Sequence, residues 1–543
     1  MKKLFILFAY YLLSTACCLS QTWQWAKHCG SPSYDRGFLC IDSAGNSYIT
    51  GELSSPSGIF GSDTISVIGI IDDAFITKVD INGNFIWSKR AGGNDVTTSS
   101  GDRGSDILFD KSSNSIIFCG NFDSNSPNIG TCNTGSGAQT FLSKLDTAGN
   151  CIWAQYVASR IGAGKIIMDN DKNIYMIGSI LQAAWFNTTP TLQVQAGGFL
   201  AKFNSLNGNC IWAKKITESN SLGTGISFYN NKLYIVGISA NDTLKLDTAT
   251  AYCYPNNVFI SEFDTAGSVQ WVKTMGGPQG ANAGSISLDG SGNIYATGVF
   301  KDTAYFGSTM LTNGSNYDLF LAKYNNTGTF TWVKQAHATG NFINGASVSS
   351  DANGNVYVGG GFSGTATFGT YTVTAATATD LFVARYDNNG NCIGVTQADN
   401  SKNGWTNVVS DNTGGFHVAG EFTGTTTFGS YPLTSYGGVC DVFVARHDAI
   451  TGIQEFGRTA NNQLMIYANP TIGKCNITVP DEFLHEKNLV LSIYDNTGRL
   501  IQQTKVEMNE DKIKLNLEAE AKGVYHATLS NGKKSYGGKI VFE

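Results

Sequence analysis

The oxygen-rich stretch Asp169–Asn173 comes closest to a metal-binding motif in this chain. Its sequence, DNDKN, places side-chain oxygens where a calcium-binding loop has its first ligands. Such a loop also needs a glycine at its sixth position and a glutamate at its twelfth, where this chain has Ile174 and Ile180. Asp and Asn are equally typical of β-turns, so we expect a turn here and no bound metal.

Other catalytic or metal-binding patterns are missing from the sequence. The six histidines are scattered without an HxxxH pair, and there is no CxxC pair, GxSxG elbow or phosphate loop. Paired carboxylates for glycoside hydrolysis cannot be identified either, because loop acids that are distant in sequence could still meet in space. We therefore predict no catalytic, cofactor-binding or metal-binding residue.

The chain is organised around a repeated pair of strands, best seen in DLFLAKYNNTGTFTWVK from Asp318 to Lys334. Leu319–Tyr324 is apolar on both faces, as in a strand covered by layers on both sides. Asn325–Gly328 has turn residues, and Thr329–Lys334 returns as a second strand. Copies recur about every sixty residues, marked by Phe75, Phe141, Phe199, Phe259, Phe320, Phe382 and Phe443.

Each repeat also has an earlier strand pair, such as SISLDGSGNIYATGVF at Ser285–Phe300. This gives four strands per repeat and seven repeats, which predicts an all-β, seven-bladed propeller at residues 21–456. The strand Thr22–Lys27 precedes the first repeat, and we expect it to complete the last blade and cover its edge. The repeat tryptophans should pack between blades; they are Trp25, Trp87, Trp153, Trp212, Trp271 and Trp332.

The cysteines give no clear disulfide framework. Cys151, Cys210 and Cys392 share one repeat position, and equivalent positions in neighbouring blades should be too far apart to bridge. We expect these three to be buried thiols. One or two disulfides remain open among the others, namely Cys29, Cys40, Cys119, Cys132, Cys253, Cys440 and Cys475.

Residues 1–20 have the features of a secretory signal peptide. Lys2 and Lys3 precede a short apolar run, and cleavage is expected between Ser20 and Gln21. The chain has 63 glycines, only 14% charged residues and a net charge of −6, which suits an exported β protein. No basic cluster and no long apolar run follow, so we expect neither a nucleic-acid partner nor a transmembrane segment.

Residues 22–456 resemble the β-propeller repeat proteins of secreted Bacteroidota proteins that carry a DxxGNxYxTG signature. Asp289–Gly298, DGSGNIYATG, matches that signature closely. Two propeller enzyme families fit less well. Asn204–Trp212 has the Gly-to-Trp spacing of quinoprotein dehydrogenases but no vicinal disulfide beside it, and Asp80–Trp87 has an extra residue relative to the sialidase motif. The resemblance implies a fold and a compartment rather than an activity.

After a polar linker at residues 457–462, residues 463–543 resemble the type A C-terminal sorting domain of the type IX secretion system. The matching pieces include IYANPTIG, IYDNTGRL and GVY, in the family's order. The resemblance implies an Ig-like domain that is recognised by the secretion machinery. The residues that carry it are Asn469, Pro470, Gly473, Asp495, Gly498, Gly523, Tyr525, Gly532 and Lys539.

Together these features predict a protein that passes through the periplasm to the outer cell surface or the medium. We expect a non-enzymatic binding or adhesion module for an unknown glycan or protein, because function on such scaffolds lies in loops. The alternative is a glycan-active hydrolase or lyase with its site in the propeller channel. Converging acidic and basic side chains at the channel mouth would favour the enzyme, and a lining of Ser, Thr and Asn would favour binding.

Overall fold

The protein contains two compact units, one at Trp23–Glu455 and one that includes Phe456–Glu543. Its structure, a computed structural model, describes residues 23–31, 35–54, 56–68, 72–94, 101–133, 139–158, 161–180, 184–186, 192–218, 222–340, 342–399, 401–437, 439–448, 464–484, 486, 489–495, 499–506, 512–531 and 535–543. These residues form strands and one 3-10 turn, Asp481–Phe483, and include no α-helix and no helix able to span a membrane. The expected cleavage position at Ser20 and Gln21 lies outside them.

Seven antiparallel core sheets of four strands each occur in the described part of the first unit. Core sheet 1 comprises β2 (Arg36–Ile41), β3 (Ser47–Leu53), β6 (Asp73–Val79) and β7 (Phe85–Asn94). Core sheet 2 comprises β8 (Arg103–Asp110), β9 (Ser115–Phe122), β12 (Gln139–Asp146) and β13 (Cys151–Ala158). Core sheet 3 comprises β14 (Ile161–Met168), β15 (Asn173–Ile180), β18 (Gly197–Asn204) and β19 (Cys210–Lys215).

The remaining core sheets repeat the same strand order. Core sheet 4 comprises β20 (Leu222–Tyr229), β21 (Lys232–Ser239), β24 (Asn257–Asp264) and β25 (Val269–Met275). Core sheet 5 comprises β26 (Ala281–Leu288), β27 (Ile294–Phe306), β28 (Thr309–Tyr324) and β29 (Phe330–Ala338). Core sheet 6 comprises β30 (Ile343–Ser350), β31 (Val356–Phe362), β34 (Asp380–Tyr386) and β35 (Cys392–Ala398). Core sheet 7 comprises β36 (Ser401–Ser410), β37 (Phe416–Phe422), β40 (Asp441–His447) and β1 (Trp23–Gly30).

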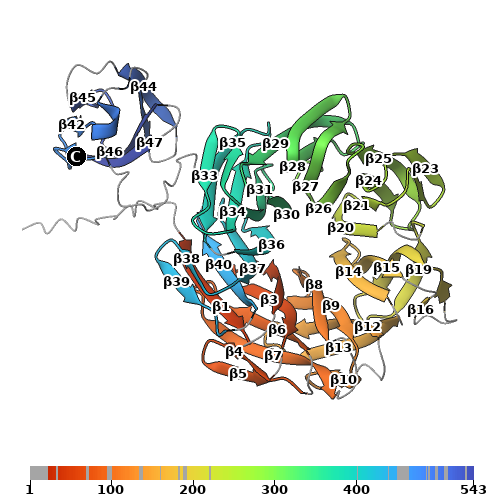
Figure 1. The fold of residues 1–543 in the computed structure, drawn as a ribbon. Helices are drawn as coiled ribbons and strands as arrows, with labels where there is room; N and C mark the ends of the chain where they lie inside the picture. The colour runs from red at the N-terminus through yellow and green to blue at the C-terminus, as the bar shows by residue number, and fades with distance from the viewer. Residues whose placement is uncertain are drawn as a thin grey trace, which may run out of the picture. The chain divides into compact units, whose positions relative to one another are not determined.

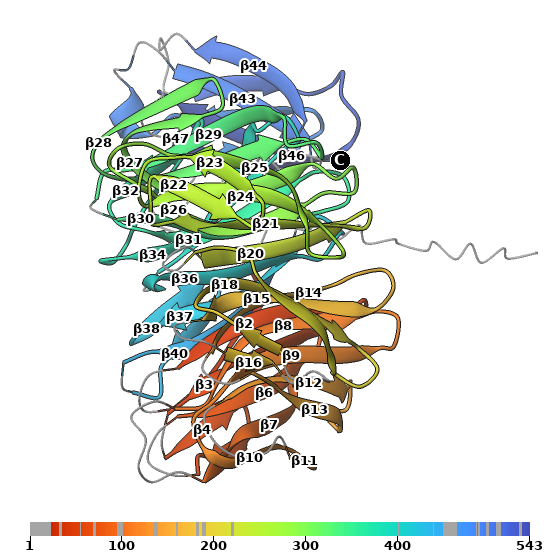
Figure 2. The ribbon, with the colours of Figure 1, turned by 90° about the vertical axis from the view of Figure 1, so that its right-hand side faces the viewer.

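The first strands of the core sheets contact one another in a closed cycle. β2 contacts β8, the contacts continue through β14, β20, β26, β30 and β36, and β36 contacts β2 again. Figure 1 shows the sheets following one another in chain order, and Figure 2 shows them from the side after a quarter turn. Four-stranded sheets arranged in this way are propeller-like.

The N-terminal strand completes core sheet 7. β1 pairs with β40 from Trp23 opposite His447 to Cys29 opposite Val442, and Figure 1 shows the two strands side by side. Core sheet 7 thus takes three strands from the end of the repeat region and one from its beginning, as the sequence analysis expects. This pairing removes an edge that would otherwise be free to pair with another chain.

A short outer hairpin lies between the second and third strands of each repeat, a feature that the sequence analysis did not identify. In the first repeat, β4 (Ser57–Phe60) pairs with β1 and β5 (Asp63–Ser66) contacts β7. This hairpin therefore bridges core sheets 7 and 1. In the fifth repeat the outer ends of β27 and β28 form it. The hairpin strands of the remaining repeats are β10 (Asn125–Ile129), β11 (Cys132–Asn133), β16 (Ala184–Phe186), β17 (Leu192–Val194), β22 (Thr243–Leu246), β23 (Ala249–Tyr252), β32 (Thr365–Phe368), β33 (Tyr371–Thr374), β38 (Thr425–Phe428) and β39 (Tyr431–Thr434).

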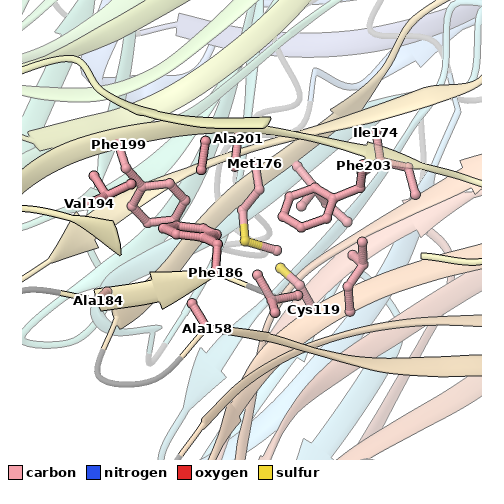
Figure 3. Packing of buried hydrophobic residues seen from close by; sticks show 14 of the residues in the cluster. Cys119, Ala158, Ile174, Met176, Ala184, Phe186, Val194, Phe199, Ala201 and Phe203 are labelled. Carbon is pink, nitrogen blue, oxygen red and sulfur yellow. The ribbon is translucent and has the colours of Figure 1, made fainter. Parts of the chain in front are cut away.

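Apolar side chains fill the spaces between neighbouring core sheets. Figure 3 shows one such cluster, in which Cys119 of core sheet 2 lies near Met176 and Phe203 of core sheet 3. The third strands β24 and β34 are buried along most of their length, as their two apolar faces predict. Burial of apolar surface in these clusters provides most of the driving force for folding.

The repeat tryptophans lie against turn glycines of the next core sheet. The Trp25 indole donates a hydrogen bond to the Ile81 carbonyl oxygen at 2.8 Å, and a Cβ on Gly83 would lie 2.8 Å from the ring. The glycines have positive φ between 72° and 85°, a conformation that favours glycine. The pairs are Trp25 with Gly83, Trp87 with Gly149, Trp153 with Gly208, Trp212 with Gly267, Trp271 with Gly328 and Trp332 with Gly390.

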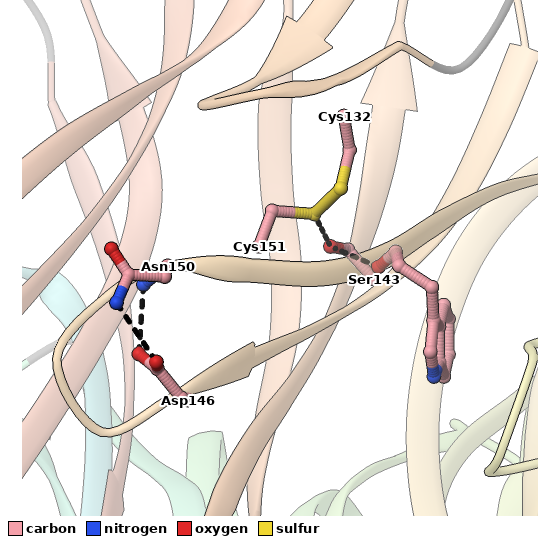
Figure 4. Close-up of a disulfide and its surroundings, with 6 residues drawn as sticks. Cys132, Ser143, Asp146, Asn150 and Cys151 are labelled. Carbon is pink, nitrogen blue, oxygen red and sulfur yellow. Dashed lines mark hydrogen bonds between the residues drawn. A yellow bond between two sulfur atoms is a disulfide. The ribbon is translucent and has the colours of Figure 1, made fainter.

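One prediction about cysteines is wrong, because Cys151 is not a thiol. It forms a disulfide with Cys132, and their Cα atoms are 6.1 Å apart (Figure 4). Cys132 lies on the outer hairpin strand β11, which contacts β13 where Cys151 begins that strand. Cys132 and Cys151 therefore belong to the same repeat. The distance between equivalent positions in neighbouring blades, on which the prediction for Cys151 was based, does not limit this pairing. Cys210 and Cys392 are free thiols and partly exposed.

The described residues of the second unit form two sheets around one apolar core. One sheet has three strands, β41 (Ile466–Tyr467), β42 (Lys474–Thr478) and β45 (Lys512–Asn516). The other has four strands, β44 (Leu500–Val506), β43 (Leu489–Asp495), β46 (Gly523–Ser530) and β47 (Ser535–Phe542). Both sheets contribute to the core, for example through Ile477 and Ile493.

Candidate functional site

The residues considered for calcium form a hydrogen-bonded turn. The Asp169 carboxylate accepts bonds from the Asn173 backbone N–H at 2.7 Å and from the Tyr175 hydroxyl at 3.0 Å. Asp289 accepts equivalent bonds from Asn293 and Tyr295, so the Asp, Asn and Tyr of the signature fix one turn. Among the described residues, no group of three or more His, Cys, Asp or Glu is suited to a metal ion.

The last glycine of the DxxGNxYxTG signature lies on the second strand of a core sheet. It allows the first strand, called the inner strand below, to approach the second strand closely. A Cβ on this glycine would lie between 1.7 and 2.2 Å from a carbonyl oxygen of the inner strand in five core sheets. It would also touch the ring of the marker phenylalanine on the third strand. Glycine is therefore required sterically at Gly51, Gly120, Gly178, Gly298 and Gly360.

Five inner strands, those of core sheets 2 to 6, contain a β-bulge. Each bulge adds one residue to the inner strand and is reflected in a shift of the pairing register. Bulges re-aim side chains and are frequent near functional sites. The added residues are all small and all line one cavity; they are Ser105, Gly164, Thr224, Gly284 and Ala346.

This central cavity has a volume of about 460 Å³ and is lined by the first strands of all seven core sheets. Its size falls within the range of small-molecule sites, roughly 300–1,000 Å³. On the side of core sheets 4 to 6 the lining consists of small and neutral polar residues, such as Ser285 and Asn344. The opposite side carries charged residues, so the lining is strongly asymmetric.

The charged side of the cavity contains three cations and is supported by buried carboxylates. The Arg36 Nε lies 3.6 Å from Glu52 Oε1 and 3.4 Å from Glu421 Oε1. The Arg36 side chain is 38% exposed, whereas that of Glu421 is 2% exposed. Arg103 occupies the position of Arg36 in the next core sheet and is exposed. The cations on this side are more exposed than the carboxylates Glu52 and Glu421, which also line the cavity.

Lys165 extends the cationic surface to core sheet 3. Its Nζ lies 3.1 Å from Asp106 Oδ1 and 4.4 Å from the centre of the Phe38 ring. Both contacts fix the ammonium group beside the cavity. Phe38 belongs to β2, which pairs with β3 without a bulge.

Burial raises the pKa of Glu52 above its usual value, while the neighbouring Arg36 and Arg103 lower it. A carboxyl group with a raised pKa beside a second carboxylate is an arrangement that acid–base catalysis can use. Here both Glu52 and Glu421 are paired with Arg36, which also fits a structural role. The converging acidic and basic side chains on this side of the cavity favour an enzyme, whereas the small and neutral polar residues on the opposite side favour binding.

The structure brings several of the predicted sorting residues into contact with other parts of the second unit. Asn469 donates to the Lys539 carbonyl oxygen at 2.6 Å and accepts from the Val541 N–H at 2.8 Å, so these motif segments are adjacent. Asp495 pairs with Tyr525 across β43 and β46. Gly473 has φ of 111°, Pro470 follows Asn469, and Gly523 begins β46. Gly498 and Gly532 lie outside the described residues.

The sequence analysis missed the cationic residues of the central cavity. Arg36, Arg103 and Lys165 are about sixty residues apart and none belongs to a recognisable motif. The one available signal was the repeat itself, since Arg36 and Arg103 each stand before a Gly at the start of an inner strand. Lys165 follows the bulge residue Gly164, so its position depends on a bulge that the sequence did not predict.

The second unit matches a known family. Residues 465–543 match the model described as "Secretion system C-terminal sorting domain". This domain indicates export by type IX secretion to the cell surface or the extracellular space, and it implies interaction with that secretion machinery. The prediction from the sequence motifs is thereby confirmed.

Several known proteins resemble this chain at low sequence identity. The uncharacterized WD repeat-containing protein L264 of Acanthamoeba polyphaga mimivirus is 28% identical over 166 residues, which cover 27% of this chain and 12% of the viral protein. The chain thus spans about an eighth of the length of that relative. Two solved structures each cover 79% of this chain and 98% of their own. One is a protein of unknown function from Dyadobacter fermentans, with 8% identity and a TM-score of 0.36, and the other is BamB from Moraxella catarrhalis, with 11% and 0.31. Likeness at this level assigns no ligand.

Proposed function

We propose that the protein is a non-enzymatic binding protein built from a seven-bladed β-propeller at residues 21–456 and an Ig-like sorting domain at residues 463–543. Seven four-stranded core sheets in a closed cycle support the number of blades. Two sheets around one core support an Ig-like sandwich. The signal peptide at residues 1–20 and the linker at residues 457–462 complete this organisation.

The ligand that we propose is an extracellular molecule with carboxylate or sulfate groups, bound in the central cavity. The observation that carries this proposal is the placement of Arg36, Arg103 and Lys165 on one side of the cavity. The carboxylate partners Glu52, Glu421 and Asp106 have less exposed side chains than Arg36 and Lys165, so an entering ligand meets positive groups first. Such groups recognise carboxylates and sulfates directly. The small residues opposite leave space for the rest of the ligand.

Titration calorimetry of the full chain with oligogalacturonate tests this proposal. We expect saturable binding that weakens with salt and falls at least tenfold in the Arg103→Ala/Lys165→Ala double variant. Lys245→Ala removes an exposed cation on an outer hairpin and is the matched control, which should bind like the wild type. Equal binding by the double variant, or no binding of any oligouronate or sulfated glycan, would contradict the proposal.

A second candidate is a glycan-active hydrolase or lyase in the same cavity. Glu52 and Glu421 both lie within 4 Å of the Arg36 Nε, so two carboxyl groups face one small volume, as glycoside hydrolysis requires. If this reading is right, the full chain should cleave polysaccharides, and both Glu52→Gln and Glu421→Gln should abolish cleavage. Glu218→Gln, at an exposed residue elsewhere, should not. Absence of cleavage by the wild type would leave the binding proposal as the better one.

A further inference from the structure

A second hollow lies between the outer hairpins of core sheets 4 and 5 and shares no lining residue with the central cavity. It has a volume of about 420 Å³ and is lined by Tyr252, Tyr254 and Tyr305 together with the end of β25. Tyr252 ends the outer hairpin strand β23, and Tyr305 lies on the outer part of β27. The two hairpins therefore approach the end of β25 from its two sides.

Hydrogen bonds fix the three tyrosines around this hollow. The Thr274 hydroxyl donates to the Tyr252 carbonyl oxygen at 3.1 Å, and the Asn257 amide donates to the Tyr254 carbonyl oxygen at 3.0 Å. Gly276 and Tyr305 exchange two backbone hydrogen bonds, at 3.1 and 2.8 Å. The tyrosine backbones are thus held in place before any ligand arrives, which lowers the entropic cost of binding.

Gly276 lines the hollow and lets the Asn257 side chain pack closely against the backbone there. Its φ is 124°, and a Cβ there would lie 1.8 Å from Asn257 Oδ1. The Asn257 oxygen instead accepts a hydrogen bond from the Gly277 N–H at 2.9 Å. A larger residue at position 276 would displace Asn257, whose amide group also donates to the Tyr254 carbonyl oxygen.

The aromatic rings are unusually accessible. Tyr252 is 84% exposed, Tyr254 47% and Tyr305 45%. Met310, which pairs with Tyr305 across the hairpin, is 56% exposed and extends the apolar surface. Clustered exposed apolar residues of this kind mark interaction sites, and tyrosine offers an apolar ring with a polar hydroxyl.

The lining also restricts the chemistry of the ligand. None of its residues is charged, so an anionic or cationic partner would lose hydration without gaining a counter-charge. A neutral pyranose ring fits, because its C–H face can pack on a tyrosine ring while its hydroxyls bond to phenol and backbone groups. The exposure of Tyr252 leaves the hollow open to a ring within a longer chain.

We propose that Tyr252, Tyr254 and Tyr305 form a binding site for the neutral sugar rings of an extracellular polysaccharide. This site is separate from the central cavity and requires no charge on the ligand. It would hold the exported protein on a glycan whatever the central cavity binds. The proposal does not depend on the ligand proposed for that cavity.

Affinity electrophoresis of the full chain in gels containing xylan, mannan or mixed-linkage β-glucan tests the proposal. We expect at least one neutral polysaccharide to retard the wild type, with retardation insensitive to salt. Tyr252→Ala and Tyr305→Ala should each weaken binding at least tenfold, whereas Tyr252→Phe and Tyr252→Trp should retain most of it because they keep a ring. Trp185→Ala, which removes a 46% exposed aromatic residue from another hairpin, is the matched control.

Several outcomes would overturn the proposal. One is retardation that is equal for the wild type, Tyr252→Ala and Tyr305→Ala, and another is the absence of retardation in every neutral gel. Retention only in alginate or polygalacturonate gels would also refute it and would assign glycan binding to the cationic cavity. Because the tyrosine side chains are exposed, the variants should keep the wild-type melting temperature, so lost binding would not reflect unfolding.

Discussion

The contact between Trp25 and Gly83 offers a direct test of how the N-terminal strand closes the first unit. Trp25 lies on β1 and is 5% exposed, and Gly83 lies in the turn between β6 and β7. A methyl group on Gly83 would meet three ring atoms of Trp25 at 2.8 to 3.1 Å. Gly83→Ala should therefore clash with the ring in addition to straining a residue with φ of 85°.

The expected magnitudes follow from these two effects. Positive-φ strain costs about 1–2 kcal/mol and overpacking about 1–3 kcal/mol, so Gly83→Ala should destabilise by roughly 2–5 kcal/mol. Trp25→Ala should cost about 3–5 kcal/mol, as for other large-to-small changes in a core. In the double variant the clash is absent, and Gly83→Ala should cost only the strain, about 1–2 kcal/mol.

Urea denaturation followed by tryptophan fluorescence measures these values in the full chain. All nine tryptophans lie before residue 457, so the signal reports the first unit alone. Gly424→Ala is the control, because Gly424 has φ of 63° and no heavy atom within 4 Å of an added Cβ. The reasoning fails if Gly83→Ala costs the same free energy with and without Trp25, since the two residues would then not be in contact.

Four further outcomes are expected. Replacing Cys132 and Cys151 by serine should lower the free energy of unfolding by about 3 kcal/mol, because the disulfide closes a loop of some twenty residues. Burial raises the pKa of the Asp35 carboxyl to about 7, so stability should fall as the pH rises from about 4 to about 7, and Asp35→Asn should flatten this fall. Deletion of residues 463–543 should leave a folded first unit in the periplasm of the native host, as cell fractionation would detect. A chelator should change the melting temperature by less than about 2 °C, because we expect no structural ion, and only a bound ion would stabilise the fold by mass action.

Each of these expectations has an opposite result that would contradict it. If replacing Cys132 and Cys151 by serine leaves the free energy of unfolding unchanged, measured without reductant, then the disulfide does not constrain the unfolded chain. A parallel pH profile in Asp35→Asn would show that Asp35 does not titrate between its ordinary pKa and about 7. Arrival of the truncated chain at the surface would mean that residues 463–543 are not needed for export, and a drop of several degrees with chelator would reveal an ion.

The strands, their turns and the repeat were accessible from the sequence because they depend on local patterns. Apolar residues on both faces of Leu319–Tyr324 predict a strand covered on both sides, and β28 is buried there. Asp289 and Asn293 mark a turn because their side chains bond to the backbone within it. Pairing of the N-terminal strand followed from counting strands over the repeats. The sorting motifs were recognised because they stand in fixed order over some eighty residues.

The outer hairpins and the disulfide needed the tertiary structure. Cys132 and Cys151 are nineteen residues apart. Their approach depends on the outer hairpin formed by β10 and β11, in which β10 pairs with β7 of core sheet 1 and β11 contacts β13 of core sheet 2. The variable stretch that forms this hairpin has short strands and no strong periodicity, so its pairing partner was not apparent.

The central cavity was decided by tertiary structure alone. Its cations come from β2, β8 and β14, which lie together because the first strands of core sheets 1, 2 and 3 contact one another, and Glu421 joins them because core sheet 7 packs against core sheet 1. Bulges such as the one at Gly164 set where the following side chain points, and a one-residue change in register reverses the face on which a side chain lies. A repeat pattern specifies that such strands exist, but convergence of single side chains depends on register and closure, which arise from packing between residues far apart in the chain.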